Sequence, residues 1–467
     1  MAEFDYDLVV IGSGPAGHHA AIQAAKLRKR VMVLERKPIV GGICINAGTI
    51  PSKTIREAVL YLSGYWQRGI YGQSYQLKER ITLEDLRNRV QPVVRHEVDV
   101  SRHQLARNDV EITHAEASFT GPHTLRLARS GESTRRTVSA RYIMIAVGTE
   151  ATRDPQMPLD GQMVFASDDV MQLEELPRTL AVVGGGVIGC EYASMFAALG
   201  IRVTLIDKRT RLLPFVDAEI VRALRYHLGE NRVTFRLGEE VAGAEVIEDQ
   251  GLRRVRMALT SGKQIVADKV LSSVGRTGAI ASLNLAAAGI EPDPRGRIPV
   301  NSSYQTAIPH IYAAGDVIGF PSLASTSAEQ GRLAACHAFG VEARWSPELF
   351  PYGIYTIPEI SFVGRNEEEL TEEKVPYEIG KAQYREIARG NIIGDSIGML
   401  KLLFDRATRE LLGVHIVGEH AVELVHIGQA VLAYQGKVDY FIETVFNYPT
   451  LAECYKNAAF DGINRLQ

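Results

Sequence analysis

Hydrophobic and polar positions in the first 35 residues predict a β-α-β unit. An apolar run from Leu8 to Ile11 ends at Gly12, helical spacing follows over 15–29, and a second apolar run ends at Glu35. The same layout recurs over residues 179–209. Short apolar runs that end at glycines are typical of buried strands in a parallel sheet. Two such units in one chain predict two nucleotide-binding domains.

The rest of the chain alternates between helical and extended patterns. Residues 54–110 have apolar positions at helical spacing, and residues 141–155 form a buried strand that leads into the second unit. A strand, a Gly-Asp turn and a helix over 310–340 are expected to return to the first sheet. The C-terminal part has two strands about a turn, at 401–418, and then a helix. Antiparallel strands with helices on one side predict a separate α+β domain.

Composition narrows the classes of function. The chain has 467 residues, of which 46% are hydrophobic, and a formal net charge of −3. That charge does not indicate a nucleic-acid or membrane-surface partner. The longest apolar runs are far shorter than the ~20 residues of a membrane span, and the N-terminus has no signal-peptide pattern. We therefore expect a cytoplasmic protein without a membrane or nucleic-acid partner.

Four cysteines stand at positions 44, 190, 336 and 454. None of them has the spacing of a zinc site, so no metal is expected. We interpret Cys190, Cys336 and Cys454 as buried small hydrophobic residues. Cys44 differs because the segment around it, GGICINAGTIPSK, has the form of a redox site.

The turn after the first strand, GSGPAG at 12–17, predicts a dinucleotide site. Gly12 allows the tight turn, Gly14 lets the backbone approach a pyrophosphate, and Gly17 allows the helix to pack closely on the strand. The helix N-terminus adds N–H donors and a partial positive charge. Glu35 can accept hydrogen bonds from ribose hydroxyls. In the second motif, GGGVIG, the corresponding glycines are Gly184, Gly186 and Gly189.

The strand after the second motif ends in mixed charges. Asp207 suits the free 2′-hydroxyl of NAD, whereas Lys208, Arg209 and Arg211 could pair with the 2′-phosphate of NADP. Two interpretations stay open, a solvated basic loop or a pocket that accepts both nucleotides. Asp316, in AAGD, could hold a ribitol hydroxyl in the segment that returns to the first sheet. We therefore assign FAD to the first motif, and NAD(H) or NADP(H) to the second.

The motifs together resemble those of the pyridine nucleotide-disulfide oxidoreductase family. GSGPAG, GGICINAGTIPSK, GGGVIGCEYA, VGRTG, AAGDV and TIPEISFVG stand in the order found in that family and cover essentially the whole chain. The resemblance implies an α/β protein with two Rossmann-like dinucleotide-binding domains and a C-terminal α+β dimerisation domain. The implied boundaries are 1–150 and 276–345 for the FAD domain, 151–275 for the NAD(P) domain and 346–467 for the interface domain. A homodimer is implied, and assembly beyond a dimer stays open.

The resemblance also implies roles for individual residues. Lys53 would lie beside flavin N5 with Glu191 as its carboxylate partner, so that a cation stabilises the reduced flavin; a weak surface ion pair is the alternative. Val187 stands where some members have a bulky gate over the flavin, although packing explains it equally well. The implied FAD contacts are Gly12, Gly14, Gly17, Glu35, Arg36, Lys37, Gly42, Ile43, Cys44, Thr49, Lys53, Ala117, Gly148, Asp316 and Ala324. The implied NAD(P) contacts are Gly184, Gly186, Val187, Gly189, Glu191, Asp207, Lys208, Arg209 and Gly275.

Two positions depart from the disulfide-reducing members of the family. Those members have a C-x₄-C pair where this chain has Cys44 and Thr49, and a hydroxyl cannot form an intramolecular disulfide. They also have a histidine immediately before Pro-Thr, where this chain has Tyr448, although Glu453 is kept. A phenol with an unperturbed pKa near 10 transfers protons poorly at neutral pH. The two matched losses argue against disulfide reduction.

Hydride exchange with the flavin remains. Without a sulfur acceptor, a second nicotinamide nucleotide can take back the hydride that the first one delivered. We therefore predict reversible, ping-pong hydride transfer between NADPH and NAD⁺ through FAD N5, with Lys53 and Glu191 as catalytic residues and Cys44 as a wall of the site. One alternative is an NAD(P)H dehydrogenase, or diaphorase, that reduces quinones or dyes. Another is a flavin-binding protein without catalysis. The direction of transfer in the cell and the preference between NAD and NADP stay open.

Overall fold

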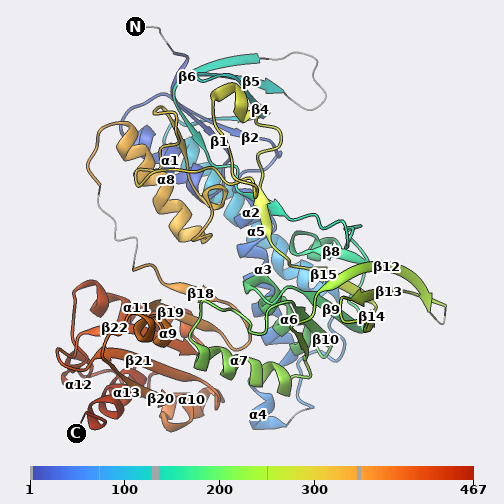
Figure 1. Ribbon diagram of the computed structural model, residues 1–467, viewed down its shortest axis with the longest axis vertical. Coiled ribbons are helices and arrows are strands. Elements are labelled where there is room, and N and C mark those ends of the chain that lie inside the picture. The colour runs from blue at the N-terminus through green and yellow to red at the C-terminus, as the bar shows by residue number, and fades with distance from the viewer. Residues whose placement is uncertain (1–3, 73, 129–135, 250, 344–348, 467) are drawn as a thin grey trace. The chain divides into compact units, whose positions relative to one another are not determined.

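The computed structural model describes residues 4–72, 74–128, 136–249, 251–343 and 349–466 (Figure 1). The chain divides into two compact units. The first comprises Met1–Thr54, Arg87–Thr152 and Gly275–Trp345, and the second comprises Ile55–Leu86, Arg153–Val274 and Ser346–Gln467. Within the described residues, no helix is both long enough and apolar enough to cross a membrane.

A mostly parallel sheet forms the centre of the first unit. β1 (Tyr6–Ile11) lies between β2 (Val31–Glu35) and β6 (Arg136–Ile145) and is parallel to both. β3 (Glu111–His114) extends the sheet beyond β2, and β17 (Ile311–Ala313) pairs in parallel with β6. The expectation that the segment 310–340 returns to the first sheet is therefore confirmed.

Two helices cover one face of this sheet. α1 (Pro15–Lys26) packs against α8 (Ala324–Ala338), and residues of both helices share one hydrophobic core with Leu8 and Val10 of β1. Val9 and Ile11 point to the other face, which packs on a second core. Residues 8–11 of β1 are therefore all apolar, as is usual for a strand that is buried on both sides. α1 ends three residues earlier than predicted, because Arg28 adopts a left-handed conformation with φ of 58°.

The remaining elements of the first unit lie around the sheet. The predicted helical region contains α2 (Gly42–Asn46), α3 (Thr49–Ser63), α4 (Arg68–Tyr71) and α5 (Leu83–Ala106), with α4 and parts of α3 and α5 in the second unit. An antiparallel hairpin that the sequence pattern did not predict consists of β4 (Glu116–Gly121) and β5 (Thr124–Ala128), and β5 pairs with β6. The short strands β7 (Thr149–Ala151) and β16 (Arg276–Gly278) pair with each other.

The second unit contains the second predicted β-α-β unit. β9 (Thr179–Val183), α6 (Val187–Ala198) and β10 (Arg202–Asp207) follow one another, and β10 pairs in parallel with β9. The parallel sheet is completed by β11 (Thr234–Leu237), β15 (Lys269–Ser272) and β8 (Val164–Ala166), in the order β11-β10-β9-β15-β8. α7 (Ala218–Glu230) follows β10. A second antiparallel sheet that was not predicted is formed by β12 (Val241–Asp249), β13 (Leu252–Leu259) and β14 (Gln264–Ala267).

The C-terminal part of the second unit is an antiparallel sheet with helices. Its strands are β18 (Tyr352–Ile354), β19 (Ile360–Gly364), β20 (Tyr377–Gln383), β21 (Met399–Asp405) and β22 (Leu411–Val417), in the order β18-β19-β22-β21-β20. Its helices are α9 (Glu367–Glu372), α10 (Ala388–Ile393), α11 (Ala421–Ala433), α12 (Asp439–Glu443) and α13 (Glu453–Asn464). α11 and α13 share one hydrophobic core with β21 and β22.

Four short 3₁₀ helices complete the secondary structure of the described residues: η1 (Ser167–Gln172), η2 (Leu285–Ala288), η3 (Asp316–Ile318) and η4 (Tyr384–Glu386). The predicted fold class, two Rossmann-like units followed by an antiparallel α+β part, is confirmed.

Candidate dinucleotide sites

Glycine occupies the three positions of the first turn for different structural reasons. Gly12 has φ of +104°, and a Cβ there would overlap the carbonyl oxygen of Ala146. A Cβ at Gly17 would overlap the carbonyl oxygen of Gly12. At Gly14, by contrast, the nearest atom to an added Cβ is Gly42 Cα at 3.9 Å. Packing within the protein therefore explains Gly12 and Gly17, whereas Gly14 leaves open space beside the backbone.

That space lies at the start of α1. Gly14 is the N-cap of α1, Pro15 occupies the first turn, and among the described residues no side chain caps the helix. An uncapped helix start presents backbone N–H donors and the positive end of the helix dipole. These features fit a pyrophosphate that approaches Gly14.

Glu35 at the end of β2 belongs to a buried hydrogen-bond network. Its Oε2 accepts hydrogen bonds from the backbone N–H and the hydroxyl of Ser13, at 3.2 and 2.6 Å, and its Oε1 accepts one from Lys37 N at 3.0 Å. The Ser13 hydroxyl also accepts a hydrogen bond from Gly41 N at 2.9 Å. The network ties the end of β2 to the glycine turn and to the segment before Cys44. The side chains of Arg36 and Lys37 are exposed.

The Cys44 segment packs directly against the first glycine turn. Gly42 has φ of +59°, and a Cβ there would lie 2.8 Å from Gly14 Cα. Ile43 and Cys44 follow on α2 and are half-buried, and Thr49 begins α3. Burial raises the pKa of the Cys44 thiol, and a hydrogen bond with Thr49 opposes this only in part. The thiol is therefore the dominant form at neutral pH.

The return segment brings further predicted residues into the first unit. Asp316 follows β17 and begins η3, and burial raises its pKa although the nearby charge of Arg276 opposes the shift. Gly148 has φ of +67° with open space around an added Cβ, and Ala324 begins α8. Ala117 differs from these, because its side chain is buried in the core on β4, so that only its main chain could face a ligand.

The second glycine turn repeats the pattern of the first. Gly184 has φ of +107°, an added Cβ there would overlap the carbonyl oxygen of Ser273, and one at Gly189 would overlap that of Gly184. An added Cβ at Gly186 would meet no atom within 4 Å. Gly186 is also the N-cap of α6, without a side-chain hydrogen bond, and Val187 begins the helix. This turn fits a second pyrophosphate for the same physical reasons.

Asp207 at the end of β10 is buried, and both of its carboxylate oxygens accept hydrogen bonds from the protein. Its Oδ2 accepts hydrogen bonds from Gly185 N at 2.5 Å and Arg209 Nη2 at 2.6 Å. Its Oδ1 accepts hydrogen bonds from Arg209 N at 2.7 Å and Arg209 Nε at 2.9 Å. Burial alone would raise the pKa of Asp207, but the hydrogen bonds from Arg209 outweigh it and hold the pKa below its usual value.

The other cations near Asp207 are directed elsewhere. Lys208 is largely exposed, with Nζ 3.6 Å from Glu240 Oε1. Arg211 donates hydrogen bonds to Glu368 and to the carbonyl oxygen of Val216. Of the three cations that follow Asp207, only Arg209 folds back on the carboxylate. Gly275, predicted to contact the nucleotide, is exposed with φ of +139°.

Glu191 is a buried carboxylate on α6, with 4% of its surface exposed. Its Oε1 accepts a hydrogen bond from Tyr355 N at 2.9 Å. One turn further along α6, the Ser194 hydroxyl accepts a hydrogen bond from Ile357 N at 3.0 Å. The segment after β18 is thus held to α6 at two points. Sequence reasoning missed both contacts, because main-chain donors leave no residue-type signal. Lys53 lies on the first turns of α3, in the first unit.

Comparison with known proteins gives the family. The chain matches the pyridine nucleotide-disulphide oxidoreductase family over residues 6–331 and the dimerisation domain of that family over 350–459. The chain belongs to the pyridine nucleotide-disulphide oxidoreductase family. It is therefore an oxidoreductase whose family implies binding of FAD and a pyridine nucleotide, and the two glycine turns fit these groups.

Two relatives of this family are similar over nearly the whole length. A soluble pyridine nucleotide transhydrogenase of Mycobacterium bovis (strain BCG / Pasteur 1173P2) is 53% identical, with 99% of this chain and 98% of the relative covered. A soluble pyridine nucleotide transhydrogenase of Colwellia psychrerythraea is 44% identical, with 99% of both chains covered.

Two solved structures have the same fold. LpdA from Mycobacterium tuberculosis superimposes with a TM-score of 0.88 at 25% identity, with 98% of this chain and 99% of that chain covered. The HOCl-induced flavoprotein disulfide reductase RclA from Escherichia coli gives a TM-score of 0.86 at 26% identity, with 97% and 99% covered.

The structure shows the environment of Cys44, Thr49 and Tyr448, where the sequence predicts departures from the disulfide-reducing members of the family. Each of the four cysteines is free, and the hydroxyl of Thr49 is the hydrogen-bond partner of Cys44. Tyr448 is 74% exposed. No described residue donates a hydrogen bond to Oε2 of Glu453.

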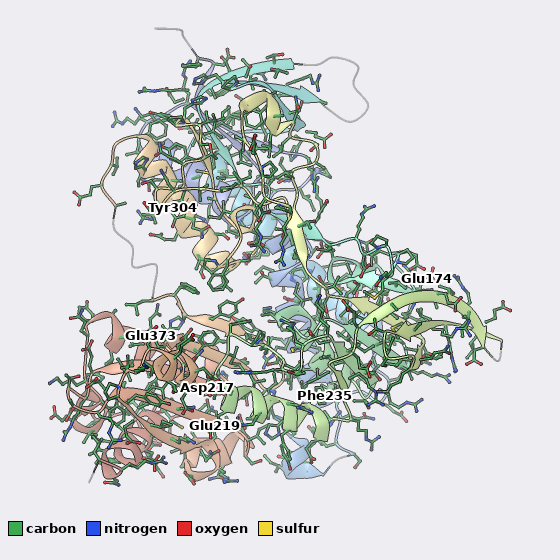
Figure 2. The ribbon with its side chains drawn as sticks, viewed as in Figure 1. Glu174, Asp217, Glu219, Phe235, Tyr304 and Glu373 are labelled. Carbon is green, nitrogen blue, oxygen red and sulfur yellow. The ribbon has the colours of Figure 1, made fainter. Side chains whose placement is uncertain are left out.

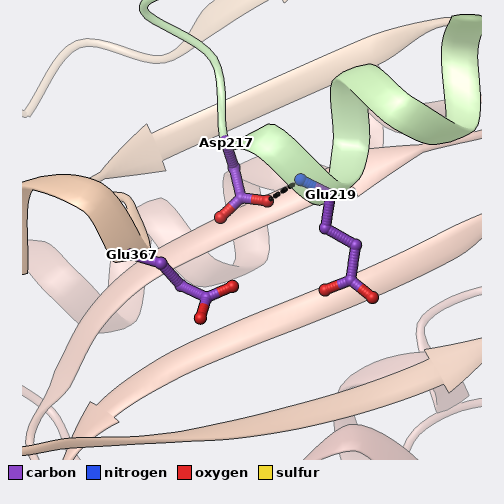
Figure 3. Close-up of side chains that lie close together, drawn as sticks. All are labelled: Asp217, Glu219 and Glu367. Carbon is purple, nitrogen blue, oxygen red and sulfur yellow. Dashed lines mark hydrogen bonds between the residues drawn. The ribbon is translucent and has the colours of Figure 1, made fainter. Parts of the chain in front are cut away.

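A cluster of carboxylates in this oxidoreductase lies apart from both glycine turns in the sequence. Figure 2 labels Asp217 and Glu219 at the start of α7, and Figure 3 shows Glu367 of α9 facing the same space. Lys401 Nζ lies 2.8 Å from Asp217 Oδ2 and 3.3 Å from Glu219 Oε2, and it also pairs with Glu367. Because this buried ammonium pairs with all three carboxylates and occupies the space between them, we interpret the cluster as charge pairing rather than as a metal site.

Proposed function

We propose that this chain is an FAD-dependent transhydrogenase that moves hydride reversibly between NADPH and NAD⁺. The observation that carries the proposal is the pairing of Cys44 with Thr49, which leaves no sulfur partner for a redox disulfide. The names of the relatives at 53% and 44% identity support the same activity.

The two glycine turns would hold the two dinucleotides. Gly14 and the start of α1 would bind the FAD pyrophosphate, Glu35 would accept hydrogen bonds from its ribose, and Asp316 would hold its ribitol. Gly186 and the start of α6 would bind the pyrophosphate of the nicotinamide nucleotide. Bound FAD supplies a group that can take up a hydride from one nicotinamide nucleotide and return it to another.

Lys53 and Glu191 would place charge beside the flavin. A lysine ammonium favours added negative charge on the flavin, and a carboxylate partner fixes its position. Tyr355 N holds Glu191 at 2.9 Å and thereby limits the rotamers of the carboxylate. The protonated thiol of Cys44 would form part of the wall and would accept no electrons. Both nucleotides would therefore use one site in turn, which gives ping-pong kinetics.

The proposal includes an arrangement of the whole protein. Residues 1–150 and 276–345 would form the FAD domain, 151–275 the NAD(P) domain and 346–467 an interface domain through which two chains form a homodimer. The match of residues 350–459 to the family's dimerisation domain supports the last assignment.

Anaerobic stopped-flow absorbance tests the function. NADPH is expected to bleach the flavin absorbance, and NAD⁺ added afterwards is expected to restore it in the absence of oxygen. Steady-state rates with both nucleotides should give the parallel double-reciprocal lines of a ping-pong reaction. Restoration by a quinone but not by NAD⁺ would instead indicate a diaphorase, and failure of NADPH to bleach the flavin would indicate a binding protein.

A further inference from the structure

The carboxylate of Asp207 has no acceptor position left for a ribose. A carboxylate has about four lone-pair sites for hydrogen bonds. Protein donors fill four of them: Gly185 N and Arg209 Nη2 on Oδ2, and Arg209 N and Arg209 Nε on Oδ1. Asp207 is also 5% exposed. In this state Asp207 cannot receive the ribose hydroxyls of NAD(H) unless a donor moves away.

Arg209 is the donor that can move. The Gly185 N–H and the Arg209 N–H belong to the main chain, whose path is fixed by Gly238 N donating to Arg209 O at 3.1 Å and Glu239 N donating to Asp207 O at 3.2 Å. The guanidinium, in contrast, is on a side chain that is 45% exposed. Departure of Arg209 would free one acceptor position on each carboxylate oxygen, which suits the two hydroxyls of a ribose.

The same guanidinium is arranged to receive a 2′-phosphate while it stays in place. Arg209 contacts Asp207 through Nε and Nη2, and no described residue accepts a hydrogen bond from its Nη1. An unpaired carboxylate at this position would repel a phosphate, because two like charges would lie close together. The Arg209 pair cancels that charge, and its outer edge still offers N–H donors of the kind that bind phosphate in a fork.

We propose that Arg209 is a two-position specificity residue: paired with Asp207 it admits the 2′-phosphate of NADP(H), and displaced from Asp207 it exposes the carboxylate to the ribose of NAD(H). The inference rests on the proposed function, because only a site that serves both nucleotides in turn needs such a device. Neither neighbour replaces Arg209 in this role, since Arg211 is directed to Glu368 and Val216, and Lys208 lies beside Glu240.

Two adenosine phosphates that differ only in the 2′-phosphate test the inference without any turnover. Binding of adenosine 2′,5′-bisphosphate and of adenosine 5′-monophosphate to the flavin-loaded protein is measured by isothermal titration calorimetry. In Arg209→Ala, affinity for the bisphosphate should fall ~10- to 100-fold, as expected for loss of a charge-assisted contact. Affinity for the monophosphate should stay the same or rise, because Asp207 is released.

Asp207→Asn should shift the two affinities in the opposite direction. The amide keeps an acceptor for Gly185 N but removes the negative charge, so the bisphosphate should bind more tightly and the monophosphate more weakly. Arg211→Ala is the matched control, because it removes the same charge two residues away. Both of its affinities should remain within about threefold of the unmodified protein.

Several outcomes overturn the inference. Equal weakening of both ligands in Arg209→Ala would show that the pair only shapes the turn, and unchanged affinities would show that Arg209 does not contact the phosphate. Shifts of the same sign in Arg209→Ala and Asp207→Asn would also contradict it. If the unmodified protein binds the monophosphate but not the bisphosphate, the use of NADP(H) in the proposed function fails as well, so the two failures are distinguishable.

Discussion

At the residue scale, the surroundings of Cys44 bear on the chemistry that the proposed flavin site could perform. The cysteine remains on α2 against the first glycine turn, but its hydrogen-bond partner is the hydroxyl of Thr49. Thiol–disulfide exchange needs a thiolate and a second sulfur. Burial disfavours the thiolate here, and the second sulfur is replaced, so both requirements are missing.

The thiol of Cys44 should stay protonated across neutral pH. Because burial raises its pKa above the ordinary value of 9.0, the thiolate should form only above about pH 9. A titration of the flavoprotein followed by absorbance should therefore show no long-wavelength thiolate-to-flavin band at pH 7. Cys44→Ser is the control and should show no band at any pH. A strong band at neutral pH in the unmodified protein would contradict the burial argument.

Glu191→Gln tests the role of charge at the second predicted catalytic residue. Glutamine keeps an oxygen that can accept the hydrogen bond from Tyr355 N, so the local structure should be preserved. Loss of the negative charge should slow flavin reduction by NADPH about tenfold or more, while the affinity for NADP⁺ should change less than about threefold. Stopped-flow reduction and equilibrium titration measure the two quantities. An unchanged reduction rate would mean that Glu191 only supports the structure.

At the scale of elements, each glycine turn contains two kinds of glycine. At some positions an added Cβ would clash with the protein, and at one position in each turn it would not. Gly184 and Gly189 have protein atoms where a Cβ would be placed, but Gly186 does not. The same contrast distinguishes Gly12 and Gly17 from Gly14. A folded protein gains nothing within itself from glycine at the open positions, which is why they indicate a ligand.

Gly186→Ala should therefore lose nucleotide affinity, whereas Gly189→Ala should lose stability. Gly186→Ala should unfold at nearly the same temperature as the unmodified protein, but it should bind nicotinamide nucleotides about tenfold more weakly, because the methyl group occupies the space for the pyrophosphate. Gly189→Ala should lose about 1–3 kcal/mol of stability through overpacking against Gly184 O. Thermal unfolding and nucleotide titration of both variants check this. Equal melting temperatures for the two variants would contradict the packing argument.

The pattern of hydrophobic residues and turns in the sequence predicted the elements that contain the candidate site residues. Both β-α-β units, the return of β17 to the first sheet and the hairpin of β21 and β22 follow from short apolar runs and turns. The sheet of β12, β13 and β14 was missed, because arginines interrupt the apolar positions of β13, as in the sequence LRRVRMAL. The ion pair between Arg209 and Asp207 could not be predicted from the sequence either. Three cations follow Asp207, and only the side-chain geometry shows which of them pairs with it.

At the scale of the whole molecule, a buried ion cluster joins elements that are distant in the sequence. Lys401 on β21 is buried, and it pairs with Asp217 at the start of α7 and with Glu367 of α9. Burial alone would lower the pKa of Lys401, but the hydrogen bonds with Asp217 and Glu367 outweigh it and raise the pKa. The cluster connects the part of the second unit that contains the second glycine turn with the antiparallel sheet of that unit. No local pattern predicts a contact between residues about 180 positions apart.

Lys401→Met should destabilise the protein by about 3–5 kcal/mol at pH 7, because it leaves buried carboxylates unpaired. In the native protein the pKa values of Asp217 and Glu219 lie below their usual values, so the contribution of the pair is present at neutral pH and is lost as the pH falls below about 4. The difference in melting temperature between the variant and the native protein should therefore stay nearly constant from pH 7 to pH 5 and shrink as the pH falls below about 4.

Lys381→Met is the control for this prediction. Lys381 Nζ lies 2.7 Å from Glu219 Oε1, but its side chain is 28% exposed, so its removal should cost about 1 kcal/mol or less. A Lys401→Met variant as stable as Lys381→Met would contradict the role assigned to the cluster.

Exposed apolar and aromatic side chains on the C-terminal part support a dimer. Tyr434 and Val445 are each 88% exposed, and Tyr448 is 74% exposed, within the segment that matches the family's dimerisation domain. Exposed apolar side chains mark a protein–protein contact where they gather in one large patch. We expect sedimentation at twice the chain mass of 51.4 kDa. Val445→Glu should shift the protein toward the monomer, whereas Val266→Glu, at another exposed valine outside this segment, should not.

The hydrogen bond from Tyr355 N to Glu191 has a consequence for engineering. Glu191, the proposed catalytic carboxylate, lies on α6. The N–H group that orients it belongs to Tyr355, which comes much later in the chain. Transplanting residues 153–274 alone into another protein would remove the hydrogen bond from Tyr355 N, even if every residue of the segment were retained. A chimera of this enzyme with a relative should therefore take residues 153–274 and the loop at 355–357 from the same parent.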